Sequence, residues 1–238
     1  QATRALLIAS GWRAEPLALW SRGVDTATFT PARRSADLRD AWRVSDRRPA
    51  VLYAGRLSTE KGLDRVRAIA AVLHRMRAPH RLIFVGDGPY ARQLREACPD
   101  AIFTGTLTPP TVATAMASAD VFLFPSATDS LGNVVLEAQA AGLPVVVSDR
   151  GGPRENMQPG TTGFVCRAGD AVSFGERLAS LIGDPGLRQQ MGRMAHRYAS
   201  TRGWQASLVP LYQSWRDRAQ AAAVPALGAL RLGEGRTS

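Results

Sequence analysis

The chain has 238 residues, of which 45% are hydrophobic and 21% are charged, and a formal net charge of +10. This composition fits one medium α/β domain with additional segments, or two small domains, and no apolar stretch has the length of a membrane span or the setting of a signal peptide. Its two cysteines, Cys98 and Cys166, lie far apart and argue against a disulfide framework or a zinc site, so we expect a metal-free chain in the cytoplasm.

The first 48 residues predict a connecting segment. Residues 1–10 have the pattern of a remnant of a helix, and residues 31–48 are polar and basic. The chain starts at Gln1 instead of Met, which suggests a fragment or a processed chain.

From residue 49 onward, short apolar runs alternate with helical patterns. Strands are predicted at residues 51–54, 81–85, 101–104, 121–124, 145–148 and 163–166. Helices are predicted between them at residues 63–76, 90–97, 110–117 and 134–141, and after them at residues 171–182, 185–199 and 205–222. We therefore divide the chain into a connecting segment (1–48), a binding domain (49–203), a final helix (204–222) and a flexible tail (223–238).

Strands that are apolar throughout and separated by helices indicate a parallel sheet covered on both faces. The predicted fold class is thus α/β, a Rossmann-like domain with helix, sheet and helix layers. Ligands of such sheets bind at the carboxyl ends of the strands. Polar and glycine-rich residues follow the first four predicted strands, so four loops should meet at one crevice.

The loop after the fourth strand carries the most informative pattern. Residues 130–133 lead into a helix whose first N–H groups are unpaired, and Gly132 lets a ligand approach the backbone, which makes an anion seat. Glu137 lies about one turn inside that helix, where its carboxylate can accept hydrogen bonds from two adjacent hydroxyls. Asp129 can accept from hydroxyls beyond the phosphates. Each acid also has a simpler interpretation, Glu137 as a balance to the helix dipole and Asp129 as a loop or capping acid.

The first loop supplies cations. Arg56 and Lys61 combine a fixed guanidinium fork with a mobile ammonium, a suitable pair for a pyrophosphate, and Lys61 is the only lysine in the chain. A chance pair of cations on a solvated loop is the alternative.

The net charge also raises the possibility of polyanion binding. The arginines of the predicted helices are scattered beside acidic residues, without interleaved aromatic residues, which argues against nucleic acid as a partner. An anionic membrane surface is a better candidate partner for the positive charge of this chain.

These motifs together resemble the donor-binding domain of family 4 glycosyltransferases. The resemblance is carried, in order, by residues 55–62 (GRLSTEKG), 85–89 (VGDGP), 124–126 (FPS), 128–138 (TDSLGNVVLEA), 142–146 (GLPVV), 148–153 (SDRGGP) and 160–165 (GTTGFV). It implies one half of a GT-B fold, in which two Rossmann-like domains face each other, and sugar transfer with retention and without a metal or other cofactor.

The resemblance also implies roles for individual residues. Arg56 and Lys61 would hold the donor pyrophosphate with help from the backbone of Gly132 and Asn133. Glu137 would bind the ribose diol, and Asp129 would contact the transferred sugar. Leu107 falls where the family packs the base. The predicted catalytic set is Arg56, Lys61, Asp129 and Glu137, and the wider binding set adds Gly55, Gly86, Leu107, Leu131, Gly132, Asn133 and Val134.

The sequence departs from the family pattern at Asp129, where Glu is commoner, and at Leu131, where Phe is usual. The family's N-terminal acceptor domain is absent ahead of Gln1, so this chain alone should bind donor weakly and transfer poorly. The leading hypothesis is transfer of a hexosyl group, mannosyl from GDP-mannose, to a glycan or lipid acceptor bound by the missing domain. The alternatives are a glycolipid transferase that uses a UDP-sugar and a non-catalytic nucleotide-sugar-binding module. We place the protein in the cytoplasm or at the inner face of the membrane.

Overall fold

The computed structural model of the chain describes residues 2–15, 20 and 22–223. The flexible tail predicted from residue 223 lies outside this range, apart from Ala223, which ends the last helix. In the described part, no helix is both long and apolar enough to cross a membrane.

The predicted parallel sheet is confirmed. Six parallel strands lie in the order β3-β2-β1-β4-β5-β6, with bounds β1 Ala50–Ala54, β2 Arg81–Val85, β3 Ile102–Gly105, β4 Val121–Phe124, β5 Val145–Ser148 and β6 Gly163–Cys166. The chain builds outward from β1 to β3, returns to place β4 beside β1, and continues to β6. This reversal between β1 and β4 creates the crevice in which open α/β sheets bind ligands.

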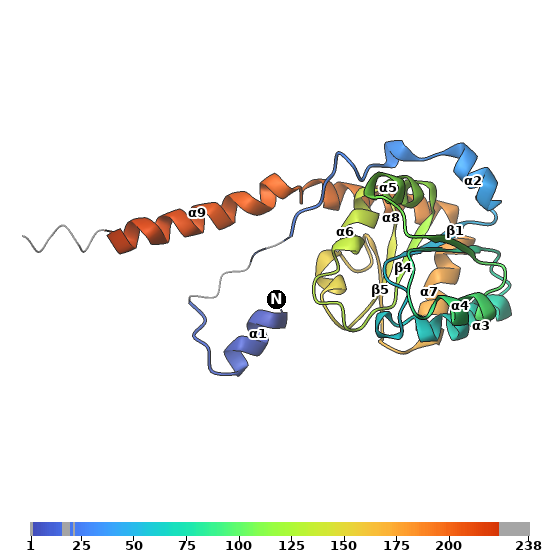
Figure 1. Cartoon of the computed structure of the whole chain (residues 1–238), viewed down its shortest axis with the longest axis horizontal. Coiled ribbons are helices and arrows are strands. Elements are labelled where there is room, and N and C mark those ends of the chain that lie inside the picture. Colours follow the sequence, from blue (N-terminus) through green and yellow to red (C-terminus); the bar gives the residue numbers. More distant parts are fainter. Residues whose placement is uncertain (1, 16–19, 21, 224–238) are drawn as a thin grey trace, which may run out of the picture.

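Helices cover both faces of the sheet and give the predicted three layers. Figure 1 shows α3 (Val66–Arg75), α4 (Ala91–Ala97) and α7 (Ala171–Gly183) on one face, and α5 (Pro109–Ser118), α6 (Asn133–Ala140) and α8 (Pro185–Ser200) on the other. α3 packs on α7, and α6 packs on α8. The strands are apolar throughout because both of their faces are covered. Leu52, Phe122 and Val146, for example, are fully buried.

The helix predicted at residues 63–76 is interrupted near its start. Residues Leu63–Arg65 form a 3₁₀ turn, and α3 begins only at Val66. The cause is Gly62, whose φ of +73° is left-handed and whose missing Cβ leaves room for the carbonyl oxygen of Pro125, 2.6 Å from where that atom would be. This close approach joins the loop after β1 to the loop after β4.

The part of the connecting segment from residue 22 onward is packed on the sheet domain, whereas α1 (Ala2–Ala9) lies apart from the sheet (Figure 1). The packed part contains α2 (Ala36–Trp42), and Val24, Phe29 and Trp42 are buried in the common core. The last helix, α9 (Trp204–Ala223), extends from the globular part (Figure 1). The division into an acceptor-side segment, a binding domain and a crossover helix stays a prediction.

Candidate functional site

A pocket of about 850 Å³ opens at the carboxyl ends of the central strands, where the strand order reverses. All residues of the predicted site except Gly132 line it: Gly55, Arg56, Lys61, Gly86, Leu107, Asp129, Leu131, Asn133, Val134 and Glu137. Gly132 is the N-cap residue of α6, between two of these residues. The structure therefore brings the predicted residues together around one pocket, and we call it the donor pocket.

Tight backbone contacts form the floor of the donor pocket. A Cβ atom on Gly86 would lie 2.1 Å from the carbonyl oxygen of Gly55, so the loops after β1 and β2 touch only because position 86 is a glycine. The hydroxyl of Tyr53 donates to the carbonyl oxygen of Arg56 at 2.9 Å, and burial, followed by the charges of Asp129 and Glu60, raises the pKa of that hydroxyl. Tyr53 therefore stays a neutral donor that fixes the backbone at Arg56.

Asp129 connects the first loop to the start of α6. Its Oδ2 accepts from Lys61 Nζ at 2.9 Å, and its Oδ1 accepts from the backbone N–H groups of Leu131 at 3.2 Å and Gly132 at 2.7 Å. Burial acts to raise the pKa of this carboxyl, but the Lys61 ammonium and the two N–H groups outweigh it and hold the pKa below its ordinary value. Asp129 thus holds the loop that precedes α6 without capping the helix itself, and it also places Lys61.

Glu137 is in the opposite situation. Its side chain is half-buried in the donor pocket, and its carboxylate makes no hydrogen bond or ion pair with any described residue. Burial raises the pKa of this carboxyl. A charge held in a partly dry site without a partner costs stability, which is the usual mark of a group kept for a ligand.

Two further groups of the donor pocket are unpaired. The exposed guanidinium of Arg56 has no ion pair with the residues that the structure describes, and Asn133 Oδ1 is buried without a hydrogen-bond partner. No side chain caps α6, whose N-cap Gly132 has φ +62° and ψ 35°. The first N–H groups of α6 therefore remain available to an anion.

The structure adds residues that the sequence did not single out. Thr106 and Val112 line the donor pocket on either side of Leu107, and Ser130 lines it beside Asp129. Their only signal in the sequence was their place just beyond a strand end. Leu107 and Val112 give that end of the pocket an apolar wall.

The donor pocket can bind a ligand with three kinds of group. Arg56, Lys61 and the start of α6 favour a diphosphate, Glu137 can accept from a diol, and Leu107 with Val112 can pack against a ring. Among the described residues, no three His, Cys, Asp or Glu side chains gather as a metal site would require.

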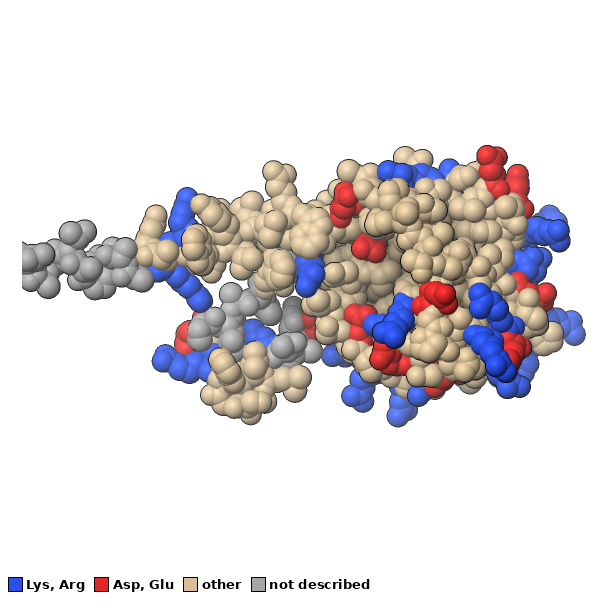
Figure 2. All heavy atoms as spheres, viewed as in Figure 1, with Lys and Arg blue, Asp and Glu red and all other residues tan. Residues whose placement is uncertain are grey.

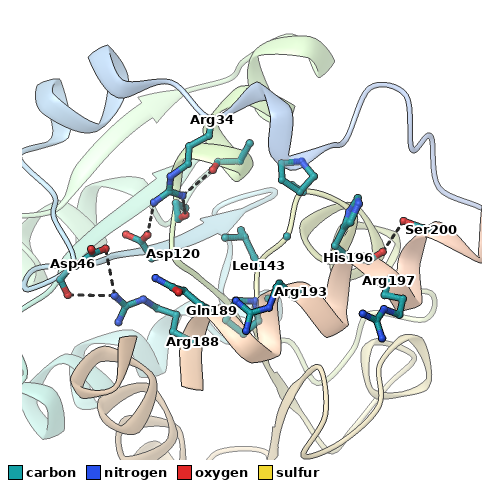
Figure 3. Close-up of a pocket in the computed structure, with 17 residues that line it drawn as sticks. Arg34, Asp46, Asp120, Leu143, Arg188, Gln189, Arg193, His196, Arg197 and Ser200 are labelled. Atoms are coloured by element: carbon teal, nitrogen blue, oxygen red, sulfur yellow. Dashed lines mark hydrogen bonds and ion pairs between the residues drawn. The ribbon is translucent and has the colours of Figure 1, made fainter. Parts of the chain in front are cut away.

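A second pocket, of about 720 Å³, lies at the opposite edge, where β4 and β5 begin (Figure 3). Several of its charged side chains are paired within the fold, whereas those of Arg193 and Arg197, which also line it, make no hydrogen bond or ion pair with the described residues. Arg34 donates to Asp120 at 2.8 Å, and Arg188 donates to the backbone of Leu181 and Asp46 at 2.7 and 3.2 Å. We place the candidate site in the donor pocket because it lies at the reversal of the strand order and gathers the predicted residues around one cavity.

Comparison with protein families supports this position. The family model described as "Glycosyl transferases group 1" matches residues 48–184, which is more than half of the chain and includes every residue of the predicted site.

Curated relatives agree with this match. A GDP-mannose-dependent alpha-mannosyltransferase of Corynebacterium glutamicum is 35% identical over 83% of this chain and 47% of its own length. One from Mycobacterium tuberculosis is 37% identical over 84% of this chain and 51% of its own length. The sulfoquinovosyl transferase SQD2 of Arabidopsis thaliana is 36% identical over 85% of this chain and 40% of its own length. The chain thus spans about half the length of these relatives.

Solved structures show the same fold. HepE of Anabaena in complex with UDP superposes with a TM-score of 0.78 at 24% identity, over 93% of this chain and 62% of that one. The sucrose-phosphate synthase of Thermosynechococcus elongatus gives a TM-score of 0.77 at 22% identity, over 92% of this chain and 57% of that one. With the fold, the position of the pocket and the family match in agreement, the chain belongs to the group 1 glycosyl transferases.

Proposed function

We propose that this chain is the donor-binding part of a retaining hexosyltransferase that transfers mannose from GDP-mannose to a glycan or lipid. The observation that carries the proposal is the unpaired Glu137 carboxylate, half-buried in the same pocket as the unpaired Arg56 and the uncapped start of α6. The mannosyltransferases among the curated relatives support GDP-mannose as the donor. Membership of family 4 and retention rest on the resemblance of the motifs.

Each group in the donor pocket has a task in this proposal. Arg56, Lys61 and the first N–H groups of α6 bind the donor diphosphate and stabilise the negative charge that builds on it as the bond to the sugar breaks. These cations do so without a metal. Glu137 accepts from the ribose hydroxyls, Leu107 packs against the base, and Asp129 accepts from the sugar. Asp129 also keeps Lys61 in place through the 2.9 Å ion pair.

The acceptor belongs to the rest of the protein in this proposal. The curated relatives are about twice as long as the chain, which supports a second domain that binds the acceptor. The exposed apolar side chains of α9, Leu208, Leu211 and Trp215, fit a helix that packs against such a domain. On this basis, the chain by itself binds donor weakly and transfers poorly. We place the protein on the cytoplasmic side, with an anionic membrane surface as a further partner.

A UDP-sugar is the second candidate donor. It is favoured by the likeness of the fold to HepE in complex with UDP and to HepE in complex with UDP-glucose. A non-catalytic binding module would keep the same nucleotide contacts, and the transferase activity of the longer protein distinguishes it.

Calorimetric titration of the chain with GDP, GDP-mannose, UDP and UDP-glucose tests the proposal. We expect the GDP compounds to bind and Glu137→Gln to weaken them about 10- to 100-fold, since a hydrogen bond to a charged group contributes about 1.5–3 kcal/mol. Glu176→Gln is the control, because Glu176 is an exposed glutamate on α7, outside the donor pocket. The proposal fails if neither GDP nor UDP compounds bind, or if Glu137→Gln leaves the affinity unchanged.

A further inference from the structure

The loop at residues 129–132, which forms one side of the donor pocket, is held from behind by residues 151–156. These belong to the connection between β5 and β6 and include the 3₁₀ turn η4 (Pro153–Asn156). The backbone N–H of Gly152 donates to the carbonyl oxygen of Asp129 at 2.8 Å. The Asn156 side chain donates from Nδ2 to the carbonyl oxygen of Leu131 and, at 3.4 Å, to that of Gly132.

The two backbones lie too close for any side chain between them. A Cβ atom on Gly152 would lie 2.2 Å from the carbonyl oxygen of Ser130, and one on Gly132 would lie 2.6 Å from Pro153 Cα. Atoms this close would have to move apart, so the loop takes its shape from the segment behind it.

Asn156 is itself fixed by α6. Gln139, a fully buried residue of that helix, donates from Nε2 to the carbonyl oxygen of Asn156 at 2.6 Å and to that of Val135 at 3.1 Å. Asn156 is only 9% exposed. The hydrogen bonds therefore run from the middle of α6 through Asn156 to the loop that precedes the helix.

Because peptide groups are planar, the contacts of Asn156 with two carbonyl oxygens also fix the direction of N–H groups beside the donor pocket. All described peptide bonds are trans, so each C=O points opposite to the N–H of the following residue. By holding the carbonyl of Leu131, Asn156 directs the N–H of Gly132 toward Asp129, whose Oδ1 accepts from it at 2.7 Å. By holding the carbonyl of Gly132, it directs the N–H of Asn133, the first of α6, away from itself and toward the pocket that Asn133 lines.

We propose that Asn156 is a positioning residue for the donor diphosphate, acting through the loop at residues 129–132. This inference rests on the proposed function. Asn156 does not line the donor pocket. It fixes the direction of the N–H groups at the start of α6, and through Gly132 and Asp129 it fixes the place of Lys61. Without it, the diphosphate would have to order these groups on binding, at a cost to its affinity.

The test compares a nucleoside with its diphosphate. The parent chain, Asn156→Asp and Asn156→Ala are titrated with guanosine and GDP, or with uridine and UDP if the parent prefers them. We expect the affinity for the diphosphate to fall about tenfold in both variants, the size of one lost hydrogen bond to a charged group, while affinity for the nucleoside changes less than about twofold. Gln139→Met removes the donor to the carbonyl oxygens of Asn156 and Val135 but leaves the Asn156 side chain in place, so it should lower diphosphate affinity in the same direction by less.

Thr162→Val is the matched control. Thr162 is a fully buried polar residue of the same connection, and its Oγ1 bonds only with Gln158, at 3.0 and 3.3 Å. It should destabilise the chain without a selective loss of diphosphate affinity. Circular dichroism and thermal melting report whether each variant is folded.

The outcomes separate the two proposals. A parent chain that binds neither GDP nor UDP overturns the proposed function and this inference with it. A parent that binds while both Asn156 variants retain full diphosphate affinity overturns the inference alone. So does an equal loss for nucleoside and diphosphate, or a loss that Thr162→Val reproduces, because Asn156 then serves only the general fold.

Discussion

Asp129 and Glu137 both line the donor pocket, and their surroundings shift their pKa values in opposite directions. Asp129 is paired with Lys61 and two N–H groups, which hold its pKa low, whereas Glu137 has no partner and burial raises its pKa. The first carboxylate therefore stabilises the folded chain, and the second is retained at a cost. Asp129 therefore helps to shape the site, whereas Glu137 keeps an unpaired carboxylate in the pocket.

The cost of Glu137 predicts a variant that is more stable but binds worse. Because its folded pKa is raised, the charged form is disfavoured in the fold, and this loss of stability is present at neutral pH and absent below the ordinary value of 4.5. Glu137→Gln should therefore melt a few degrees above the parent at pH 7, and the gap should close by about pH 4. Thermal melts across this pH range measure it. A lower melting temperature for Glu137→Gln at pH 7 would contradict the unpaired state of the carboxylate.

Asp129 predicts the opposite sign. Its folded pKa is lowered, so its stabilisation is full above the ordinary value of 3.8 and is lost as the pH falls through the folded value. Asp129→Asn should lose about 1 kcal/mol at pH 7, the usual size of a partly exposed ion pair joined by hydrogen bonds to backbone N–H groups. The difference from the parent should shrink below about pH 4. Denaturant unfolding at pH 7 and pH 3 checks this, and a constant difference at both values would rule out the ion pair as its source.

At the residue scale, the sequence predicted which side chains lie at the site, but it did not predict which of them pair with one another. Arg56, Lys61 and Glu137 were identifiable because they follow strand ends or begin a helix, and strand ends meet by topology. The pairing of Lys61 with Asp129 depends on two loops that lie 68 residues apart, which no local pattern encodes. Asn156 was missed for the same reason, since its contacts with Leu131 and Gly132 cross 25 and 24 residues.

At the scale of elements, the start of α6 depends on Gly132. This glycine has a left-handed backbone conformation and packs closely against η4. Gly132 has φ +62°, and a Cβ there would meet the backbone of Pro153. Gly160 has a similar φ of +76° with nothing within 4 Å of its missing Cβ. A comparison of alanine substitutions at Gly132 and Gly160 therefore distinguishes the effect of backbone strain from the effect of close contact with η4.

Gly160→Ala should cost about 1 kcal/mol, the strain of a left-handed alanine. Gly132→Ala should cost at least about 2 kcal/mol more, because η4 must move as well, and it should also abolish measurable binding of nucleoside diphosphates. Denaturant unfolding and calorimetry measure the two effects. Equal losses of stability in the two variants would mean that η4 yields freely and does not shape the loop.

The elements themselves were largely predictable. The sheet was predictable from fully apolar strands and from the glycines at the ends of β1, β2 and β3, and the observed strand bounds differ from the predicted ones by about one residue, as at β3 (Ile102–Gly105). The break before α3 was not predicted. It depends on the contact between Gly62 and Pro125, a packing event between two strand-end loops, while the apolar period runs through it.

At the scale of the whole molecule, a buried carboxylate joins the connecting segment to the sheet at the edge far from the donor pocket. Asp120, 7% exposed, accepts from Arg34 at 2.8 Å, from Arg39 at 2.9 Å and from the backbone N–H of Ala50 at 2.8 Å. Basic and acidic side chains are interspersed over the face of the molecule shown in Figure 2. Segment 31–48 is thus attached to the start of β1 through one side chain, although its sequence only predicts a polar connection.

Asp120→Asn should therefore destabilise the chain by about 3 kcal/mol, the cost of leaving the largely buried Arg39 guanidinium without its counter-charge. Asp46→Asn is its control, because the Asp46 carboxylate is 73% exposed and lies 3.9 Å from Arg188, and an exposed pair contributes less than about 1 kcal/mol. Below its melting temperature, Asp120→Asn should bind nucleoside diphosphates as the parent does, since the donor pocket occupies the other edge of the sheet. A loss of affinity in the folded variant would mean that the two edges are coupled through β1 and β4, and the donor pocket would then depend on the connecting segment as well as on its own loops.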